Sequence, residues 1–206
     1  MPVPPDARTV TVAAERLRGW LAGFAQRHGE VLTVAGPELV ELNGADGARA
    51  WIDVPFPPLD GDLAEHVERR RRVGVVLVRR GGHAAGVFDG HRLVASKVDS
   101  SYVQGTTKAG GWSQQRYARR RANQSRAAFA DAADVAARIL LPEVRALDAV
   151  ARGGDRRALD EVLADPRLAP VAVLVTGPLL AVPDPRLKVL QATPEQFLAV
   201  RITLTP

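Results

Sequence analysis

The sequence predicts a mixed α/β domain, with helices packed on a mixed sheet. Three apolar segments joined by glycine-containing turns predict an antiparallel meander at Val73–Val78, Ala84–Phe88 and Leu93–Lys97. After the meander, helix-like and strand-like segments alternate, which is typical of α/β proteins. The chain has 206 residues, of which 46% are hydrophobic and 25% charged, so it can bury a sizeable core.

The first part of the chain predicts a leader, a helix and short strands. Residues 1–10 are rich in proline and polar residues, and we expect a flexible leader ahead of a single domain over residues 11–206. In Val12–His28, apolar residues recur at the spacing of one helix face, and Gly29 follows as an end signal. The next predicted elements are three strands, at Val31–Ala35, Leu39–Asn43 and Ala48–Asp53, and a short helix at Leu63–Arg70.

In the second part, Val73–Val78 is apolar throughout, which predicts a central strand covered on both faces. A long helix is expected over Gln114–Leu141, because Pro142 then ends the helical pattern. The remaining predicted elements are a helix at Asp155–Ala164, a buried strand at Val171–Val175 and a closing strand at Phe197–Leu204.

Composition narrows the functional classes. The chain has no cysteine, which excludes disulfides and thiol chemistry. Its longest apolar segment, Val171–Val175, is far shorter than the ~20 residues that span a bilayer, so we expect a soluble cytoplasmic protein with no membrane partner. The net charge is +5, and the positive charges cluster at Arg69–Arg72 and from Arg116 to Arg126. Such clusters are typical of a phosphate-rich partner, although a solvated helix face explains Arg69–Arg72 equally well.

The most informative segment is the glycine-rich stretch directly before the long helix. Glycines in Gly105–Gly111, above all the pair Gly110 and Gly111, let backbone approach a ligand closely. Ser113 is a candidate N-cap that places Gln114 and Gln115 in the first helical turn, where free N–H groups favour an anion. The alternative is a flexible connection without a role.

The first turns of the helix carry the second cluster of positive charge. Arg116, Arg119 and Arg120 share one helix face, and guanidinium groups suit phosphate oxygens. We expect RNA contacts from this face, from Arg121 and from Lys108 in the loop. Trp112 is a candidate for stacking on exposed bases.

The pattern Gly-x-x-x-Ala-Gly-Gly-Trp-Ser-x-x-Arg-x-x-Arg resembles the catalytic loop of Vms-type release-factor-like proteins of the actinobacterial branch. These proteins are in turn similar to the middle domain of archaeal and eukaryotic class-1 translation release factors, where Gly-Gly-Gln precedes a Ser-x-x-Arg helix. The resemblance implies a ribonuclease-H-like fold. It also implies hydrolysis of peptidyl-tRNA on stalled large ribosomal subunits, with no metal ion and no cofactor.

One position departs from the release-factor pattern, because Trp112 stands where those proteins have the glutamine of Gly-Gly-Gln. Gln114 and Gln115 follow closely, so the expected catalytic residues are these two with Gly110 and Gly111. A neutral amide there would place water near the ester carbonyl. The departure also allows a non-enzymatic ribosome- or RNA-binding module.

A third, weaker interpretation is a metal-dependent nuclease, for which Asp53, Asp89 and Asp99 are the carboxylates near predicted strand ends. The four histidines lack the spacing of metal ligands. Two of them, His83 and His91, fall in predicted turns and are expected to be exposed.

Overall fold

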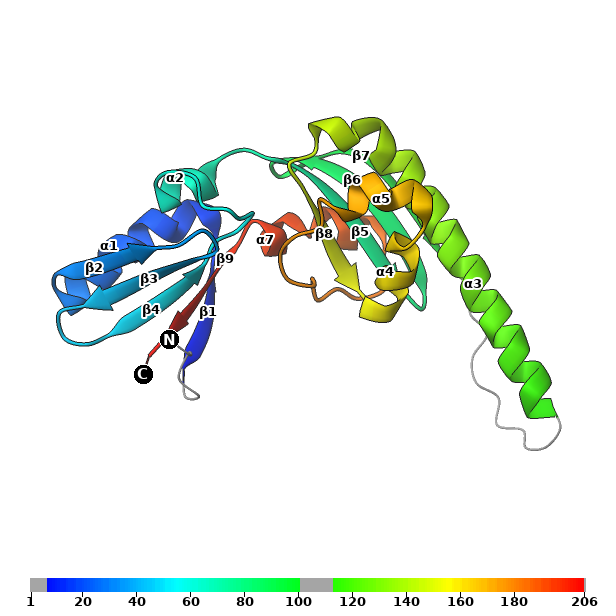
Figure 1. Ribbon diagram of the computed structural model, residues 1–206, viewed down its shortest axis with the longest axis horizontal. Coiled ribbons are helices and arrows are strands. Elements are labelled where there is room, and N and C mark those ends of the chain that lie inside the picture. Colours follow the sequence, from blue (N-terminus) through cyan, green and yellow to red (C-terminus); the bar gives the residue numbers. More distant parts are fainter. Residues whose placement is uncertain (1–6, 101–112, 206) are drawn as a thin grey trace. The chain divides into compact units, whose positions relative to one another are not determined.

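The computed structural model describes residues 7–100 and 113–205, with the backbone alone for 113–125 (Figure 1). Its contacts divide the chain into two compact units. Unit 1 comprises Met1–Arg70 and Pro194–Pro206, and unit 2 comprises Arg71–Thr193. This division differs from the single domain that we expected over residues 11–206. No helix in the described ranges is long and apolar enough to cross a membrane.

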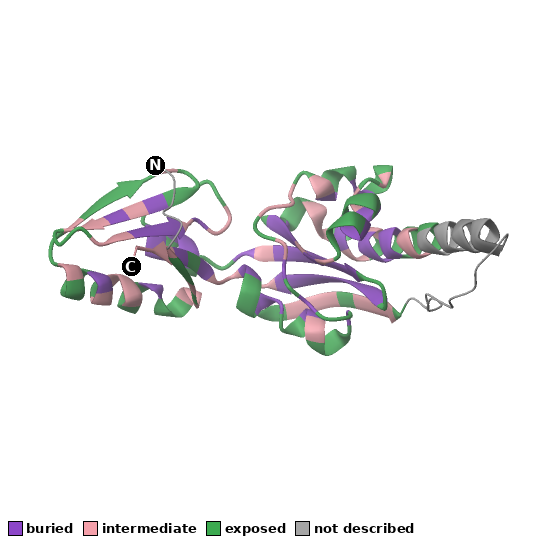
Figure 2. Ribbon diagram, turned by 90° about the horizontal axis from the view of Figure 1, so that it is seen from below, coloured by how far each residue is buried: buried purple, intermediate pink, exposed green. Residues whose placement is uncertain are grey.

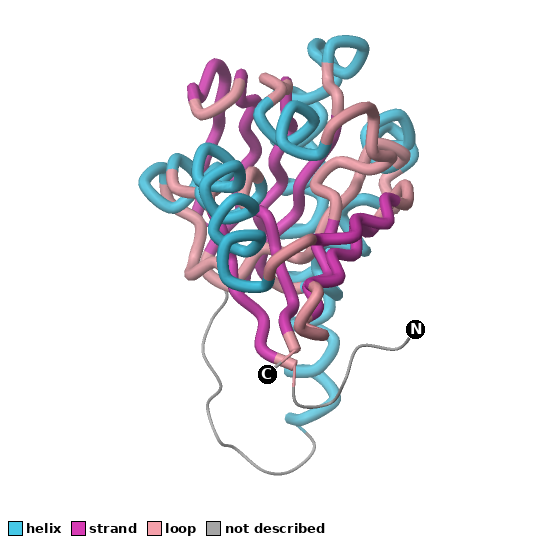
Figure 3. Tube along the Cα trace, turned by 90° about the vertical axis from the view of Figure 1, so that its left-hand side faces the viewer, coloured by secondary structure: helices cyan, strands magenta, loops and turns pink. Residues whose placement is uncertain are grey.

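Unit 1 is an antiparallel sheet with a helix on one face (Figure 3). Its strands lie in the order β1-β9-β4-β3-β2. In chain order the elements are β1 (Arg8–Val12), the 3-10 helix η1 (Ala14–Arg16), α1 (Leu17–His28), β2 (Val31–Ala35), β3 (Leu39–Gly44), β4 (Arg49–Asp53), α2 (Leu63–Glu68), α7 (Pro194–Phe197) and β9 (Val200–Leu204).

The core of unit 1 forms where α1 meets the sheet. Leu17 and Phe24 on α1 are fully buried, as are Ile52 and Ile202 on the central strands. Trp20 stacks on Phe24 with ring centroids 5.5 Å apart. The apolar spacing in the sequence therefore predicted the buried face of α1 correctly.

The N-terminal part of unit 1 differs from the sequence-based expectation. Strand β1 includes Arg8, Thr9 and Val10, which we had placed in the leader, and it pairs with β9 from Arg8↔Leu204 to Val12↔Val200. Alternating valine and threonine suits a strand with one buried face, and β9 satisfies its backbone groups. As a result, the helical part begins at Ala14 and not at Val12.

Unit 2 is built on a four-stranded sheet in the order β7-β6-β5-β8. Strand β8 runs parallel to β5 while the other pairs are antiparallel, so the predicted mixed α/β class is confirmed. Its elements are β5 (Arg72–Arg79), β6 (Gly82–Asp89), β7 (Arg92–Ser100), α3 (Ser113–Leu140), the 3-10 helix η2 (Leu141–Ala146), β8 (Ala149–Gly154), α4 (Arg156–Leu163), the 3-10 helix η3 (Pro166–Leu168), α5 (Ala169–Ala172) and α6 (Leu187–Gln191).

Both faces of this sheet are covered. Val76 and Val78 on β5 face a core that α3 and α4 complete. On the opposite face, α6 lies against β6 and β7, and a Cβ atom at Gly86 would lie 3.0 Å from the side chain of Leu190. Residues Val73–Val78 are therefore buried throughout, as the uniformly apolar sequence predicted.

Two strand predictions are wrong, one in unit 2 and one at the start of β9 in unit 1, and one strand of unit 2 was missed. The run Val171–Val175 is not a strand: Val171 belongs to α5, and Val175 forms a single bridge with Val150. Pro170 in the first turn favours the helical start. The missed strand β8 contains Arg152 and ends in two glycines, a composition with a weak strand signal. The closing strand starts at Val200, because Pro194–Phe197 is helical.

Gly154 at the end of β8 provides a test of the fold of unit 2. Its φ is +106°, and a Cβ atom there would overlap the carbonyl oxygen of Val78. We expect Gly154→Ala to lower the free energy of unfolding by about 3 kcal/mol, as measured by denaturant unfolding. Gly177→Ala is the matched control, because Gly177 also has a positive φ, +75°, but no atom lies within 4 Å of its Cβ position. The control should lose only about 1 kcal/mol, and equal losses would contradict the overlap.

Candidate functional site

The predicted site lies at and before the start of α3. Lys108, Gly110, Gly111 and Trp112 lie outside the described residues. The helix begins at Ser113, one residue before the expected start, so the helical backbone that the arginine face requires is present. For the other predicted site residues the structure describes the backbone and not the side chains. These residues are Gln114, Gln115, Arg116, Arg119, Arg120 and Arg121.

The C-terminal half of α3 fixes the direction of the helix. Among the α3 side chains that the structure describes, from Arg126 onward, the first buried one is Ala132, and Leu140 is fully buried. These residues pack on β6, β7 and β5 and on α4. Figure 2 shows buried positions on α3 where it crosses the sheet. From Ser113 to Ala132, an α-helix rises about 29 Å. The start of α3 at Ser113 therefore lies well away from the part of the helix that packs on the sheet (Figure 1).

The strand pairing shows at which end of unit 2 the chain leaves the sheet before α3. At this end of the sheet, Val78 of β5 pairs with Gly154 of β8, and Arg79 of β5 pairs with Gly82 of β6. Gly82 in turn pairs with Ser100, the last residue of β7. Strand β7 thus enters residues 101–112 at the end of the sheet beyond which α3 extends. A Cβ atom at Gly82 would lie 2.6 Å from the carbonyl oxygen of Asp99, so glycine permits this close strand pairing.

His83 follows Gly82 on β6, and the prediction that it is exposed is wrong. It belongs to β6, pairs with Asp99 of β7 and is buried, whereas His91 lies exposed in the β6–β7 turn as expected. Burial lowers the pKa of His83 below its ordinary value of 6.5, although the carboxylates of Asp99 and Asp131 oppose the shift. A glycine-rich turn one residue upstream concealed the strand position of His83 in the sequence.

The cluster Arg69–Arg72 has protein partners in the structure. The Arg69 guanidinium donates to the Asp60 carboxylate at 2.9 Å. Arg72 donates to Glu143 through Nε at 3.2 Å and Nη2 at 2.8 Å, which joins the start of β5 to η2. Arg71 is buried. These contacts give at least Arg69 and Arg72 a structural role, and favour that interpretation over RNA binding.

The carboxylates considered for a nuclease have separate environments. Within unit 2, Asp89 pairs with Arg92 at one end of the β6–β7 hairpin, and Asp99 pairs with His83 near the other. In unit 1, Asp53 accepts a hydrogen bond from Arg201 at 2.7 Å. Among the residues that the structure describes, no three histidine, aspartate or glutamate side chains are grouped to hold a metal ion.

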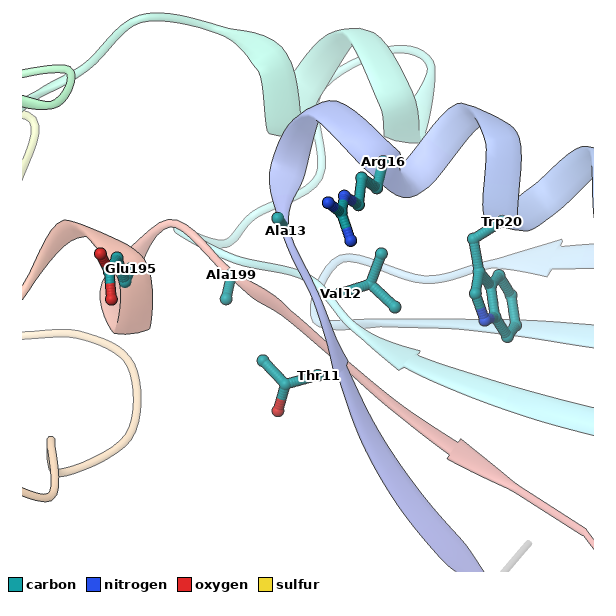
Figure 4. A pocket seen from close by; sticks show the side chains of 7 residues that line it. All are labelled: Thr11, Val12, Ala13, Arg16, Trp20, Glu195 and Ala199. Atoms are coloured by element: carbon teal, nitrogen blue, oxygen red, sulfur yellow. The ribbon is translucent and has the colours of Figure 1, made fainter.

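Unit 1 contains an open pocket of about 580 Å³. Figure 4 shows the side chains that line it, from β1, η1, α1, α7 and the segment before β9. Arg16 and Glu195 are its charged residues and Trp20 its aromatic one. The pocket contains none of the residues that the sequence predicted for the site.

Comparison with known proteins gives one sequence family and several similar structures. The profile of the Actinobacteria/chloroflexi VLRF1 release factor family matches residues 71–203, which include all of unit 2. An archaeal translation termination factor, aRF1, is 17% identical with a TM-score of 0.46, and the match covers 96% of this chain and 68% of that one. An archaeal protein is 16% identical with a TM-score of 0.42, over 92% and 64% of the two chains. No curated protein matches the chain.

The buried His83 predicts a specific dependence of stability on pH. The folded protein binds the imidazole proton less readily than the unfolded chain, because burial lowers the folded pKa. The free energy of unfolding should therefore fall as the pH drops below about 6.5, and level off below the folded pKa. Thermal unfolding between about pH 7.5 and about pH 5 measures this slope.

His83→Gln should flatten this slope, because the amide does not titrate, whereas His91→Gln, at an exposed turn residue, should retain it. An unchanged slope in His83→Gln would show that other groups cause the pH dependence.

Proposed function

Because the chain belongs to the Actinobacteria/chloroflexi VLRF1 release factor family, we propose that it releases nascent peptides from tRNA on stalled large ribosomal subunits. The reaction is hydrolysis of the ester bond between the peptide and the tRNA 3′ oxygen. Water adds to the carbonyl carbon, and the tRNA hydroxyl leaves with a proton. The family match over residues 71–203 carries the proposal, because it includes the glycine-rich segment and α3.

In this proposal the segment before α3 enters the peptidyl-transferase centre. Gly110 and Gly111 allow the backbone to approach the ester closely. Gln114 or Gln115 orients the attacking water through a neutral amide, and a carboxylate there would be repelled by nearby phosphates. The step uses no metal ion and no cofactor. Trp112 replaces the glutamine of the Gly-Gly-Gln pattern and stacks on an RNA base.

The form of unit 2 supports this proposal physically. The C-terminal part of α3 packs on the sheet, and the helix rises about 29 Å from Ser113 to Ala132, the first buried residue among those whose side chains the structure describes. A single helix of about 10–12 Å diameter suits a narrow cavity lined by RNA. Lys108, Arg116 and Arg119–Arg121 would then hold phosphates along its path.

Substitutions of the two glutamines test the chemical step. Directions of adjacent helical residues differ by ~100°, so only one of the two faces the tRNA end. We expect Gln114→Ala or Gln115→Ala, but not both equally, to lower the single-turnover release rate about tenfold to a thousandfold. Gly111→Ala should be at least as damaging. Subunit affinity should change little in all three variants, which separates chemistry from binding.

Two outcomes would change the proposal. Normal rates in both glutamine variants would move the step to backbone amides or to the ribosomal RNA. If the unmodified protein binds large subunits but releases no peptide, then it is a non-enzymatic binding module, the alternative that Trp112 favours.

The arginine face predicts a strong salt dependence of ribosome binding. Replacing Arg116, Arg119 and Arg120 by alanine should reduce the slope of log affinity against log salt by about two to three, because three phosphate contacts are lost. Circular dichroism should show an unchanged fold. An unchanged slope would place the binding surface elsewhere on the protein.

A further inference from the structure

A second group of arginines lies at the end of unit 2 beyond which α3 extends. Arg80 occupies the turn between β5 and β6, and Arg156 and Arg157 begin α4. We call these three residues the arginine rim. The sheet holds them together, because Val78 pairs with Gly154 and the Asp155 N–H donates to the Val78 carbonyl at 2.8 Å. Figure 1 shows this end of β5 and α4 on the side toward which α3 extends.

The rim carries positive charge that the protein does not neutralise. Arg80, Arg156 and Arg157 are all exposed. None of the three forms an ion pair with any residue that the structure describes. Two nearby acids, Asp184 and Asp155, have other contacts. Asp184 lies 3.6 Å from Arg79 Nε, and the Asp155 carboxylate accepts from the Ala158 N–H at 2.9 Å as the N-cap of α4.

The position of two rim residues argues against a role in stabilising the fold. Arg156 and Arg157 lie in the first turn of α4, which contains no acidic residue. The helix dipole disfavours positive charge at this end. Only Ala158, Leu159 and Val162 of α4 are buried, so the two arginines contribute little to the core. Their placement therefore suits an external anion better than internal packing.

The rim is also close to the point where the chain enters the predicted site. Gly154, one residue before the α4 N-cap, and Ser100, the last residue of β7, belong to strands at the two edges of the sheet. Three strand spacings separate these edges, which is about 14 Å. A nucleic acid that contacts the first turns of α3 can thus continue over this end of the sheet.

We infer that the arginine rim binds backbone phosphates of large-subunit ribosomal RNA. These contacts set the orientation of unit 2 on the ribosomal subunit. The inference rests on the proposed function for the identity of the partner. Exposed guanidinium groups bind phosphates without reading sequence, so the rim adds affinity and orientation but no base specificity. The ester-hydrolysing step does not involve the rim.

The test compares two charge-matched variants of the full chain. The rim variant carries Arg80→Gln, Arg156→Gln and Arg157→Gln. The control carries Arg92→Gln, Arg138→Gln and Arg145→Gln, three exposed arginines toward the end of unit 2 where β5 begins. Affinity is measured over a salt series for intact large subunits and for protein-free large-subunit RNA. Peptide release is measured at saturating subunit concentration, and thermal unfolding checks the fold.

We expect the rim variant to lower the salt slope by about two to three for both RNA probes, while the control stays close to the unmodified protein. Peptide release at saturation should be unchanged. Thermal stability should stay equal or rise, because the unfavourable charges at the start of α4 are removed.

Each other outcome has a defined meaning. Equal slopes for the rim and control variants overturn the inference while leaving the proposed function intact. A loss on intact subunits without a loss on protein-free RNA assigns the rim to a ribosomal protein and also overturns it. Rim-dependent binding without any peptide release supports the rim and contradicts the proposed hydrolysis. Absence of binding by the unmodified protein overturns both.

Discussion

The arrangement of unit 2 depends on close packing between α3 and the sheet. Ala132, Ala133 and Ala136 are small and buried, so the helix backbone lies near strands whose facing residues include Ala85. Gly74 extends this surface, because a Cβ atom there would lie 3.1 Å from the side chains of Leu140 and Leu147. Larger residues on either side would lift the helix. The direction in which the α3 backbone runs from Ala132 back to Ser113 follows from this contact.

Much of this scaffold could be predicted from the sequence, because its elements have strong local patterns. The apolar run in β5, the buried face of α1 and the order of the β5–β6–β7 meander were predicted correctly, although His83 lies in β6 and not in the turn. The failures have a common physical cause. In Val171–Val175, an apolar run of five residues fits a strand or a buried helical turn, and only tertiary contacts decide between them. Strand β8 gains its stability from pairing with β5 and not from its own composition.

The functional site was less accessible to sequence reasoning than the fold. The glycine pair and the arginines were proposed as site residues because they form a continuous motif. By contrast, the rim joins Arg80 to Arg156 across more than 70 residues, and only the parallel pairing of β5 and β8 brings them to one end of the sheet. His83 was misjudged for a similar reason, because its burial depends on β7 and α3. Proximity that arises from strand order leaves no local signal.

The connection between β7 and β8 has a consequence for how such a protein can vary. These two strands are the outer strands of the sheet, and α3 is the long link between them. The N-terminal part of α3 is helical and forms no strand pairing, so its length is independent of the register of the sheet. An insertion of seven residues there adds about 10 Å of reach and turns the tip by only about 20°. Related chains can therefore evolve a longer or shorter reach while the scaffold keeps its core unchanged.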